Sequence, residues 1–114
     1  MNIKINFSGH PVAGFEVAPL VGANLPTEGS ALAETIREII LALPEREALL
    51  AGAAAEIVLP GLSHAAAVVL SEYHGQFGGF PTIRWAVRGE KGFAWPEEAR
   101  ADLATVRESA RTAR

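Results

Sequence analysis

In the first part of the chain, the spacing of apolar residues changes from the period of a strand to that of a helix. Apolar and polar side chains alternate over residues 3–7, which is the period-two pattern of a strand. Residues 15–17 are compatible with a short edge strand, within a segment rich in Gly, Pro and Val. From residue 30 to about residue 43 the apolar positions recur every three or four residues, so we expect an amphipathic helix capped by Thr27 or Ser30.

The rest of the chain continues this alternation of strands and helices. The apolar run 57–59 predicts a buried strand, and Ser63 is a suitable N-cap for the helix that follows it. Residues 82–87 predict a further strand, and residues 93–95 return as its antiparallel partner after a turn. Pro96 favours the start of a last helix, because proline is preferred in the first turn.

The order of these elements favours an α/β domain with a mainly parallel sheet flanked by helices and a C-terminal hairpin strand. A length of 114 residues suggests a single domain, residues 1–114, with a modest core. The Gly-x-Gly-x-x-Gly fingerprint of dinucleotide binding and the Walker lysine motif are both absent from the sequence.

Composition and charge exclude several classes of protein. A net charge of −3 argues against a protein that grips long nucleic acid through a basic face, although backbone amides and helix ends can still hold a small anion. The chain has no cysteine and its histidines are widely spaced, so we expect neither a metal nor another cofactor. We find no signal peptide and no apolar run long enough to cross a membrane, and we expect a cytoplasmic protein.

Two loops carry the candidate chemistry. In an open parallel sheet, ligands bind beyond the carboxyl ends of the strands, and the loops 8–11 and 60–64 both reach that edge. Each loop contains a glycine, a serine and a histidine, and the second leads into a helix N-terminus, whose amides favour phosphate. Each feature also has an ordinary structural explanation, since glycine and proline form turns and Ser63 caps a helix.

Two further residues have roles that the sequence leaves open. His74 lies at the C-terminal end of the second helix, on the opposite edge of the sheet, where a capping role is favoured over catalysis. Arg84 lies in an apolar strand, where it is either exposed on one face of the sheet or in contact with an anion. No acidic residue can be placed beside either loop histidine, so the sequence does not support a catalytic triad.

Two segments of the chain resemble a known family. "INFSGHPV" and "PGLSHAAAVVLSEYHGQFGGFPTI" are similar to the small CRISPR-associated Csx proteins, in particular the Csx-fifteen family. The resemblance spans most of the chain and is weakest over Ala13–Gly29 and after Glu90. Gly9 departs from the family's Asn-Phe-Ser-His-Pro-like motif, which puts the geometry of that loop in doubt. The resemblance implies a Rossmann-like domain related to the CARF sensors of type III CRISPR systems.

The resemblance also implies a function. It implies a homodimer that binds a cyclic oligoadenylate second messenger and down-regulates type III CRISPR signalling. The ligand that it favours is cyclic tetra-adenylate. Because both the ring and a dimer have two-fold symmetry, each protomer would hold half of the ring, and ligand-joined dimers would build higher assemblies. The carry-over falls on Asn6, Phe7, Ser8, His10 and Pro11, and on Gly61, Leu62 and Ser63, and the shared chemistry of the two loops adds Gly9 and His64.

Binding and cleavage of such a ring are both open. Members of this group are discussed as ring nucleases or as proteins that sequester the messenger. Metal-independent ring opening needs the ribose 2′-OH in line with its phosphate, and His10 or His64 would then act as general acid or base. No residue pair in the sequence is activated, so we favour sequestration over the ring nuclease. A Rossmann-like module for another nucleotide is a further alternative.

Overall fold

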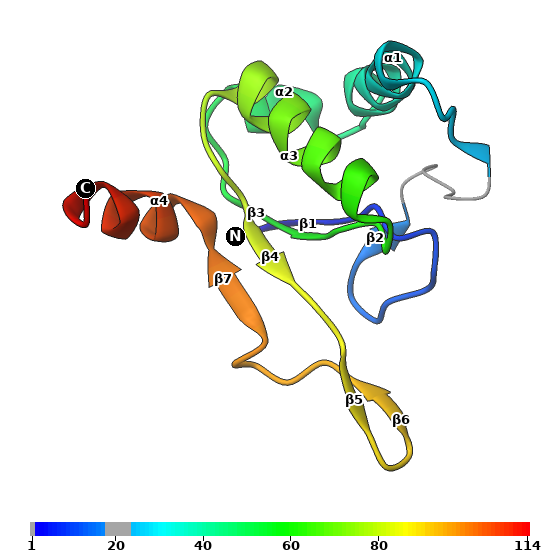
Figure 1. The fold of residues 1–114 in the computed structure, drawn as a ribbon, viewed down its shortest axis with the longest axis vertical. Helices are drawn as coiled ribbons and strands as arrows, with labels where there is room; N and C mark the ends of the chain where they lie inside the picture. Colours follow the sequence, from blue (N-terminus) through cyan, green and yellow to red (C-terminus); the bar gives the residue numbers. More distant parts are fainter. Residues whose placement is uncertain (1, 18–23) are drawn as a thin grey trace.

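The computed structural model describes residues 2–17 and 24–114. The main sheet has the strand order β2-β1-β3-β4-β7, and β5 and β6 form a separate sheet (Figure 1). The strands are β1 (Ile3–Asn6), β2 (Glu16–Val17), β3 (Ala55–Val58), β4 (Thr82–Arg84), β5 (Val87–Gly89), β6 (Gly92–Ala94) and β7 (Arg100–Asp102). The helices are α1 (Gly29–Leu41), α2 (Arg46–Leu50), α3 (Ser63–Phe77) and α4 (Leu103–Thr112). Among the helices of the described ranges, none is long and apolar enough to cross a membrane.

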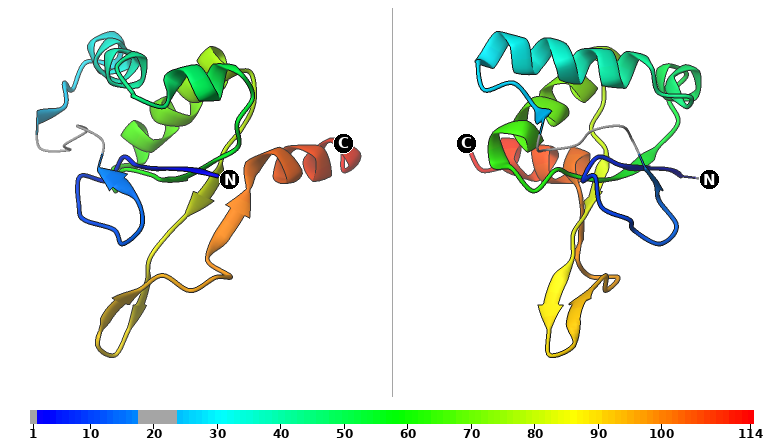
Figure 2. Two further views of the ribbon diagram at one scale, coloured as in Figure 1. Left: turned by 180° about the vertical axis from the view of Figure 1, so that it is seen from behind. Right: turned by 90° about the vertical axis from the view of Figure 1, so that its right-hand side faces the viewer.

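The first four strands of the main sheet are parallel, and β7 pairs antiparallel with β4 at one edge. Helices α1 and α3 lie in the connections that lead to β3 and to β4, and both connections advance across the sheet in the same direction. Right-handed crossovers in one direction place their helices on one face of a sheet. Helices α1, α2 and α3 do lie on one side of it (Figures 1 and 2). The chain is therefore a mixed α/β protein whose mixed sheet is flanked by helices, as the alternation of elements predicts.

The hydrophobic core lies between this face of the sheet and the helices. Ile57 of the central strand β3 is paired with Ile5 of β1, and Phe7 follows directly after β1. These three side chains pack in one cluster with Ile40 of α1 and Val69 of α3, and all five are at most 1% exposed. The apolar stripe of each helix thus faces the apolar face of the sheet.

The opposite face of the main sheet carries the alternate residues of each strand, and most of these are polar. Glu56 of β3 is only 5% exposed, and its carboxylate forms an ion pair of 3.0 Å with Arg100 of β7. Because Arg100 belongs to the last strand, this ion pair fastens the C-terminal part of the chain to the centre of the sheet. Lys4 lies on the same face, with Nζ 5.5 Å from the ring centre of Phe15.

The predicted strand over residues 82–87 is wrong in its extent, because β4 ends at Arg84 and β5 begins at Val87. Val58, the last residue of β3, pairs with Arg84, so beyond that point the chain has no parallel neighbour on this side. It pairs instead with its own return segment, and β5 and β6 form a hairpin that projects from the body (Figure 2). The predicted antiparallel return is confirmed, but the hairpin is a separate sheet.

The last helix does not begin at Pro96. A turn closed by the hydrogen bond from Ala99 N to Pro96 O (3.1 Å) is followed by β7, and α4 begins only at Leu103. Asp102 caps this helix by accepting a hydrogen bond from Ala104 N at 3.1 Å. The preference of proline for a first helical turn is overridden here because β4 offers a free edge that β7 occupies.

The N-cap of α1 is Glu28 and not Thr27 or Ser30, the residues that the sequence favours. Its carboxylate accepts hydrogen bonds from Ala31 N at 2.9 Å and from Ser30 N at 3.1 Å. These bonds stabilise the ionised form and hold the pKa of Glu28 below its usual range. Glutamate is not among the preferred N-cap residues, which is why propensity points to its neighbours.

Adjacent residues of α1 provide a test of this packing. Ile40 is completely buried (0% exposed), whereas Leu41 is 47% exposed. We expect Ile40→Ala to lower the free energy of unfolding by about 2–5 kcal/mol, because it leaves a cavity in the core. We expect Leu41→Ala to change it by about 0.5 kcal/mol or less. Urea unfolding followed by circular dichroism measures both, and equal losses in the two variants would contradict the packing of α1.

Candidate functional site

A cavity of about 630 Å³ lies at the carboxyl ends of β1, β3 and β4. Its walls come from the loop after β1, the end of β3 with the loop beyond it, the end of β4, and the hairpin β5–β6 with its flanking residues. Small-molecule pockets in proteins span roughly 300–1,000 Å³. The cavity therefore has a suitable size, and it lies where an open parallel sheet binds its ligands.

The structure brings four of the predicted ligand residues together at this cavity, namely Ser8, His10, Pro11 and Gly61. Phe7 is instead buried in the hydrophobic core at 0% exposed, so its ring is not available to a ligand. The remaining predicted residues also lie outside the described lining of the cavity, and they are Asn6, Gly9, Leu62, Ser63 and His64. Both predicted loops thus contribute to one cavity, each with only part of its residues.

Asn6 shapes the first loop from within. Its side chain is fully buried, and Oδ1 accepts hydrogen bonds from Ser8 N at 2.9 Å and from Ser8 Oγ at 2.6 Å. Its Nδ2 donates to the carbonyl oxygen of His10. These bonds close the turn, and Gly9 within it has a φ of 79°, in the left-handed region that favours glycine. Asn6 is therefore a residue that holds the loop in shape.

The hydroxyl of Ser8 is held by the same network. It donates to Asn6 Oδ1, and it accepts a hydrogen bond from His10 N at 3.2 Å. Both contacts lie within the turn, and neither is to an imidazole ring or a carboxylate. A serine hydroxyl needs an adjacent base to become a nucleophile. Ser8 is therefore placed to support the loop and to line the cavity, while the exposed His10 side chain lines it beside Ser8.

The second loop leads into α3 one residue earlier than predicted. The N-cap is Leu62, whose carbonyl oxygen accepts a hydrogen bond from Ala66 N at 2.9 Å, and Ser63 is the first helical residue. The prediction that Ser63 is the N-cap is therefore wrong, because the helical hydrogen bonds already begin at the residue before it. His64 is exposed on the first turn of the helix. Gly61 is the residue of this loop that faces the cavity, and a Cβ there would meet no atom within 4 Å.

Arg84 lines the cavity from the end of β4, and it is the one residue with a formal charge among the described lining residues. Its Nη2 donates to the carbonyl oxygens of Trp95 at 3.3 Å and Pro96 at 3.5 Å. Its Nε is buried and has no hydrogen-bond partner among the described residues. The sequence leaves two roles open for Arg84. The structure places it beside a cavity, part-buried, with an N–H donor that no described residue uses.

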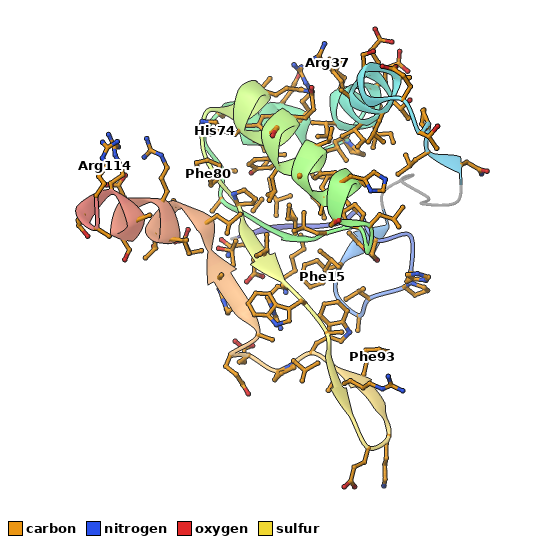
Figure 3. All side chains as sticks on the ribbon, in the orientation of Figure 1. Phe15, Arg37, His74, Phe80, Phe93 and Arg114 are labelled. Atoms are coloured by element: carbon orange, nitrogen blue, oxygen red, sulfur yellow. The ribbon has the colours of Figure 1, made fainter. Side chains whose placement is uncertain are left out.

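The sequence interpretation missed the aromatic wall of the cavity. Trp85, Phe93 and Trp95 all line it; Phe93 lies within β6, and the two tryptophans lie just outside the hairpin strands. Trp85 is 42% exposed and Phe93 is 71% exposed, so both rings offer free surface. Figure 3 shows Phe93 projecting from the hairpin. The available clue was that both tryptophans of the chain lie at the two ends of one predicted hairpin.

His74 has a structural environment far from the cavity, at the C-terminal end of α3. Its Nδ1 lies 3.3 Å from the carbonyl oxygen of Gly79, and its backbone carbonyl accepts a hydrogen bond from Gly78 N at 2.8 Å. Its ring stacks on Phe80 with the ring centres 4.2 Å apart (Figure 3). These contacts close the end of the helix, in agreement with the capping role that the sequence favours.

The chemistry of the cavity follows from its lining. Most lining residues are apolar, and the polar groups are the hydroxyl of Ser8, the imidazole of His10 and the guanidinium of Arg84. No group of three or more His, Asp or Glu side chains that could hold a metal ion occurs within residues 2–17 and 24–114. An apolar cavity with aromatic walls and one cation is suited to a molecule that combines an aromatic ring with a negative charge.

Comparisons of the chain with protein-family models, with curated proteins and with solved structures return no match.

The role of Asn6 in shaping the first loop can be tested by mutation. We expect Asn6→Ala to lower the free energy of unfolding by about 1–3 kcal/mol, because it leaves the backbone groups of Ser8 and His10 without their partners. The exposed Asn2 provides the control, and Asn2→Ala should have little effect. Urea unfolding measures the stability, and amide NMR shifts of residues 8–10 report the loop. An unchanged loop in Asn6→Ala would show that Asn6 does not shape it.

Proposed function

We propose that the cavity binds cyclic tetra-adenylate and that the protein sequesters this second messenger in type III CRISPR signalling. The observation that carries the proposal is the meeting of both predicted loops with Arg84 and three aromatic rings at one cavity. An oligoadenylate offers the matching chemistry, because its phosphates are anionic and its adenines are flat aromatic rings. The resemblance of the two loop segments to the Csx-fifteen family supplies the identity of the ligand.

The fold gives a second line of support. Strands β1, β3 and β4 are parallel neighbours joined through helices, and the cavity lies at their carboxyl ends. We propose on this basis a Rossmann-like domain related to the CARF sensors. Rossmann-like sheets bind nucleotides at that edge, because the loops and the N-termini of the following helices gather there. The order of strands and the place of the cavity are the features that support the relation.

A homodimer is part of this proposal. A ring of four nucleotides has two-fold symmetry, and a two-fold dimer presents the same cavity twice. A cavity of about 630 Å³ would hold only part of such a ring, so that each protomer would bind half of it. The stoichiometry is then one ring for two chains. A ligand that bridges dimers would extend the assembly further.

Sequestration is favoured over cleavage by what surrounds the cavity. No aspartate or glutamate is among its described lining residues, and the hydroxyl of Ser8 is held by Asn6 and by backbone groups. Among the described residues, no carboxylate is therefore placed to orient the imidazole of His10, and no imidazole is hydrogen-bonded to the hydroxyl of Ser8. Binding needs only the cation, the aromatic rings and the backbone of the loops.

Gly61 allows the cavity to be blocked without strain. A Cβ at this position would meet no atom within 4 Å, so we expect Gly61→Leu to fold and to place its side chain at the cavity that Gly61 lines. We expect this variant to lose most of its affinity for radiolabelled cyclic tetra-adenylate in a gel-shift assay. Gly75 also has open space but lies on α3 away from the cavity, so Gly75→Leu is the matched control.

Three results of this binding assay would contradict the proposal. The first is no gel shift with the wild-type protein at protein concentrations of tens of micromolar. The second is equal affinity in Gly61→Leu and wild type, which would remove this loop from the site. The third is saturation at one mononucleotide for each chain without binding of the ring, measured by calorimetry. That last result would favour the alternative of a module for another nucleotide.

Cleavage of the ring is the second candidate function, and the position of His10 in the lining of the cavity is the observation that favours it. An imidazole there would take the proton of the 2′-OH as that oxygen attacks the adjacent phosphorus, or would protonate the 5′-oxygen that leaves, so that the ring opens to a 2′,3′-cyclic phosphate and a 5′-OH. If the protein is a ring nuclease, His10→Ala should slow the formation of linear product at least tenfold while binding is largely kept. His64 lies outside the cavity lining, so His64→Ala is the control and should cleave normally.

Chromatography of the recovered nucleotide separates the two functions. After long incubation, a sequestering protein returns the ring intact, and wild type, His10→Ala and His64→Ala behave alike. Linear product from wild type would contradict sequestration alone. Equal cleavage by wild type and His10→Ala would exclude His10 as the acid or base.

A further inference from the structure

The cation in the cavity, Arg84, has no acidic partner within the part of the chain that the structure describes. Arg37, Arg100, Arg107 and Arg111 each form an ion pair with a glutamate within 4.0 Å. Among the side chains that the structure describes, no carboxylate forms such a pair with Arg84. The guanidinium of Arg84 therefore lies at the cavity wall without a direct carboxylate partner among the described residues.

The neighbour of Arg84 across the sheet, Arg100, engages two described carboxylates itself. Arg84 of β4 is paired directly with Arg100 of β7, and like charges in such a position destabilise a sheet. Arg100 is neutralised by Glu56 at 3.0 Å and by Glu97 at 3.4 Å. Both carboxylates are thus engaged by Arg100, and neither forms an ion pair with Arg84.

Arg84 is also held in place. Its Nη2 donates to two successive backbone carbonyls, those of Trp95 and Pro96, which fixes the guanidinium against the segment that follows the hairpin. Its buried Nε lacks a partner among the described residues, which is uncommon for a buried donor in a folded protein. A guanidinium has five N–H donors in a fixed fork, and this fork matches the oxygens of a phosphate.

The aromatic rings lie beside this cation rather than elsewhere on the surface. Trp85 follows Arg84 directly in the chain, and Trp95 supplies one of the carbonyls to which Arg84 donates. Phe93 is 71% exposed and lines the same cavity. A nucleobase stacks well on such rings, and stacking is tolerant of the base because every base has a π-face.

We infer that Arg84 is the phosphate-binding residue of the cavity and that Trp85, Phe93 and Trp95 form its stacking wall for the base. This inference rests on the proposed function, since it assigns the nucleotide contacts within the same cavity. It adds to the two predicted loops a third set of contacts, on β4 and the hairpin. Arg84 would contact the phosphate and the aromatic rings would contact the base. A ligand without phosphate therefore separates the two kinds of contact.

The tryptophans of the chain provide a fluorescent probe for the test. Its two tryptophans both line the cavity, so a bound nucleobase should quench the tryptophan fluorescence. The titrations use adenosine, adenosine 5′-monophosphate and cyclic tetra-adenylate with wild type, Arg84→Met, Arg84→Lys and Trp85→Ala. Arg88 lies on β5 outside the cavity lining, and Arg88→Met makes the same change of charge as the control.

We expect Arg84→Met to bind the two phosphorylated ligands roughly 10- to 100-fold more weakly and to bind adenosine as wild type does. Arg84→Lys keeps the charge but not the fork, so it should recover part of the affinity. Trp85→Ala should weaken the binding of all three ligands, and Arg88→Met should bind like wild type. In wild type, added salt should weaken the monophosphate complex and not the adenosine complex.

Each contrary result has a distinct meaning. Equal weakening of adenosine and the monophosphate in Arg84→Met would show that Arg84 only supports the structure, and it would overturn the inference. Normal binding of the ring by Arg84→Met would also overturn it while leaving the proposed function intact. Binding of the monophosphate that depends on Arg84, without binding of the ring, would uphold the inference and overturn the proposed ligand. If Arg84→Met fails to fold, Arg84→Lys and the salt dependence of wild type decide the question.

Discussion

The burial of β3 between β1 and β4 sets the position of the other elements. All four residues of β3 are buried, and the strand is hydrogen-bonded to a parallel neighbour on each side. A strand that is buried on both faces must be covered by other parts of the chain, and here the two coverings differ. Helices α1 and α3 cover the apolar face, and on the other face Arg100 covers the buried Glu56. The parallel arrangement also brings the carboxyl ends of three strands to one edge, and the cavity lies there.

The ion pair between Glu56 and Arg100 links the fold to the site. Glu56 is buried whereas the side chain of Arg100 is 41% exposed, so removing Arg100 would leave the buried carboxylate without its partner. By holding β7 against β4, the ion pair determines the path of the segment that precedes β7. That segment carries the carbonyls of Trp95 and Pro96, which receive the hydrogen bonds of Arg84. The same ion pair therefore holds Arg100 by direct contact. It also positions the backbone carbonyls to which Arg84 donates.

The residues of the candidate site have different roles. Asn6 and Gly9 determine the shape of the first loop, one by hydrogen bonds from a buried amide and the other by a positive φ. His10 and Gly61 present a side chain and an open backbone to the cavity. The hairpin adds aromatic surface that the core of the domain does not use. The proposed anion site is compatible with a net charge of −3, because a local cation matters more for binding than the total charge.

The sequence by itself determined the elements whose formation depends on local pattern. Periods of two and of three to four residues predicted β1, α1 and α3, a continuous apolar run predicted β3, and the rule that ligands bind beyond parallel strands led to both loops of the cavity. Only the tertiary structure decided the rest, because those features depend on partners distant in the chain. The break after Arg84 follows from the end of β3, and β7 replaces a predicted helical turn because β4 offers a free edge. The aromatic wall and the place of Arg84 beside it arise for the same reason, since no local pattern shows which carboxylate Arg100 engages or where the hairpin lies.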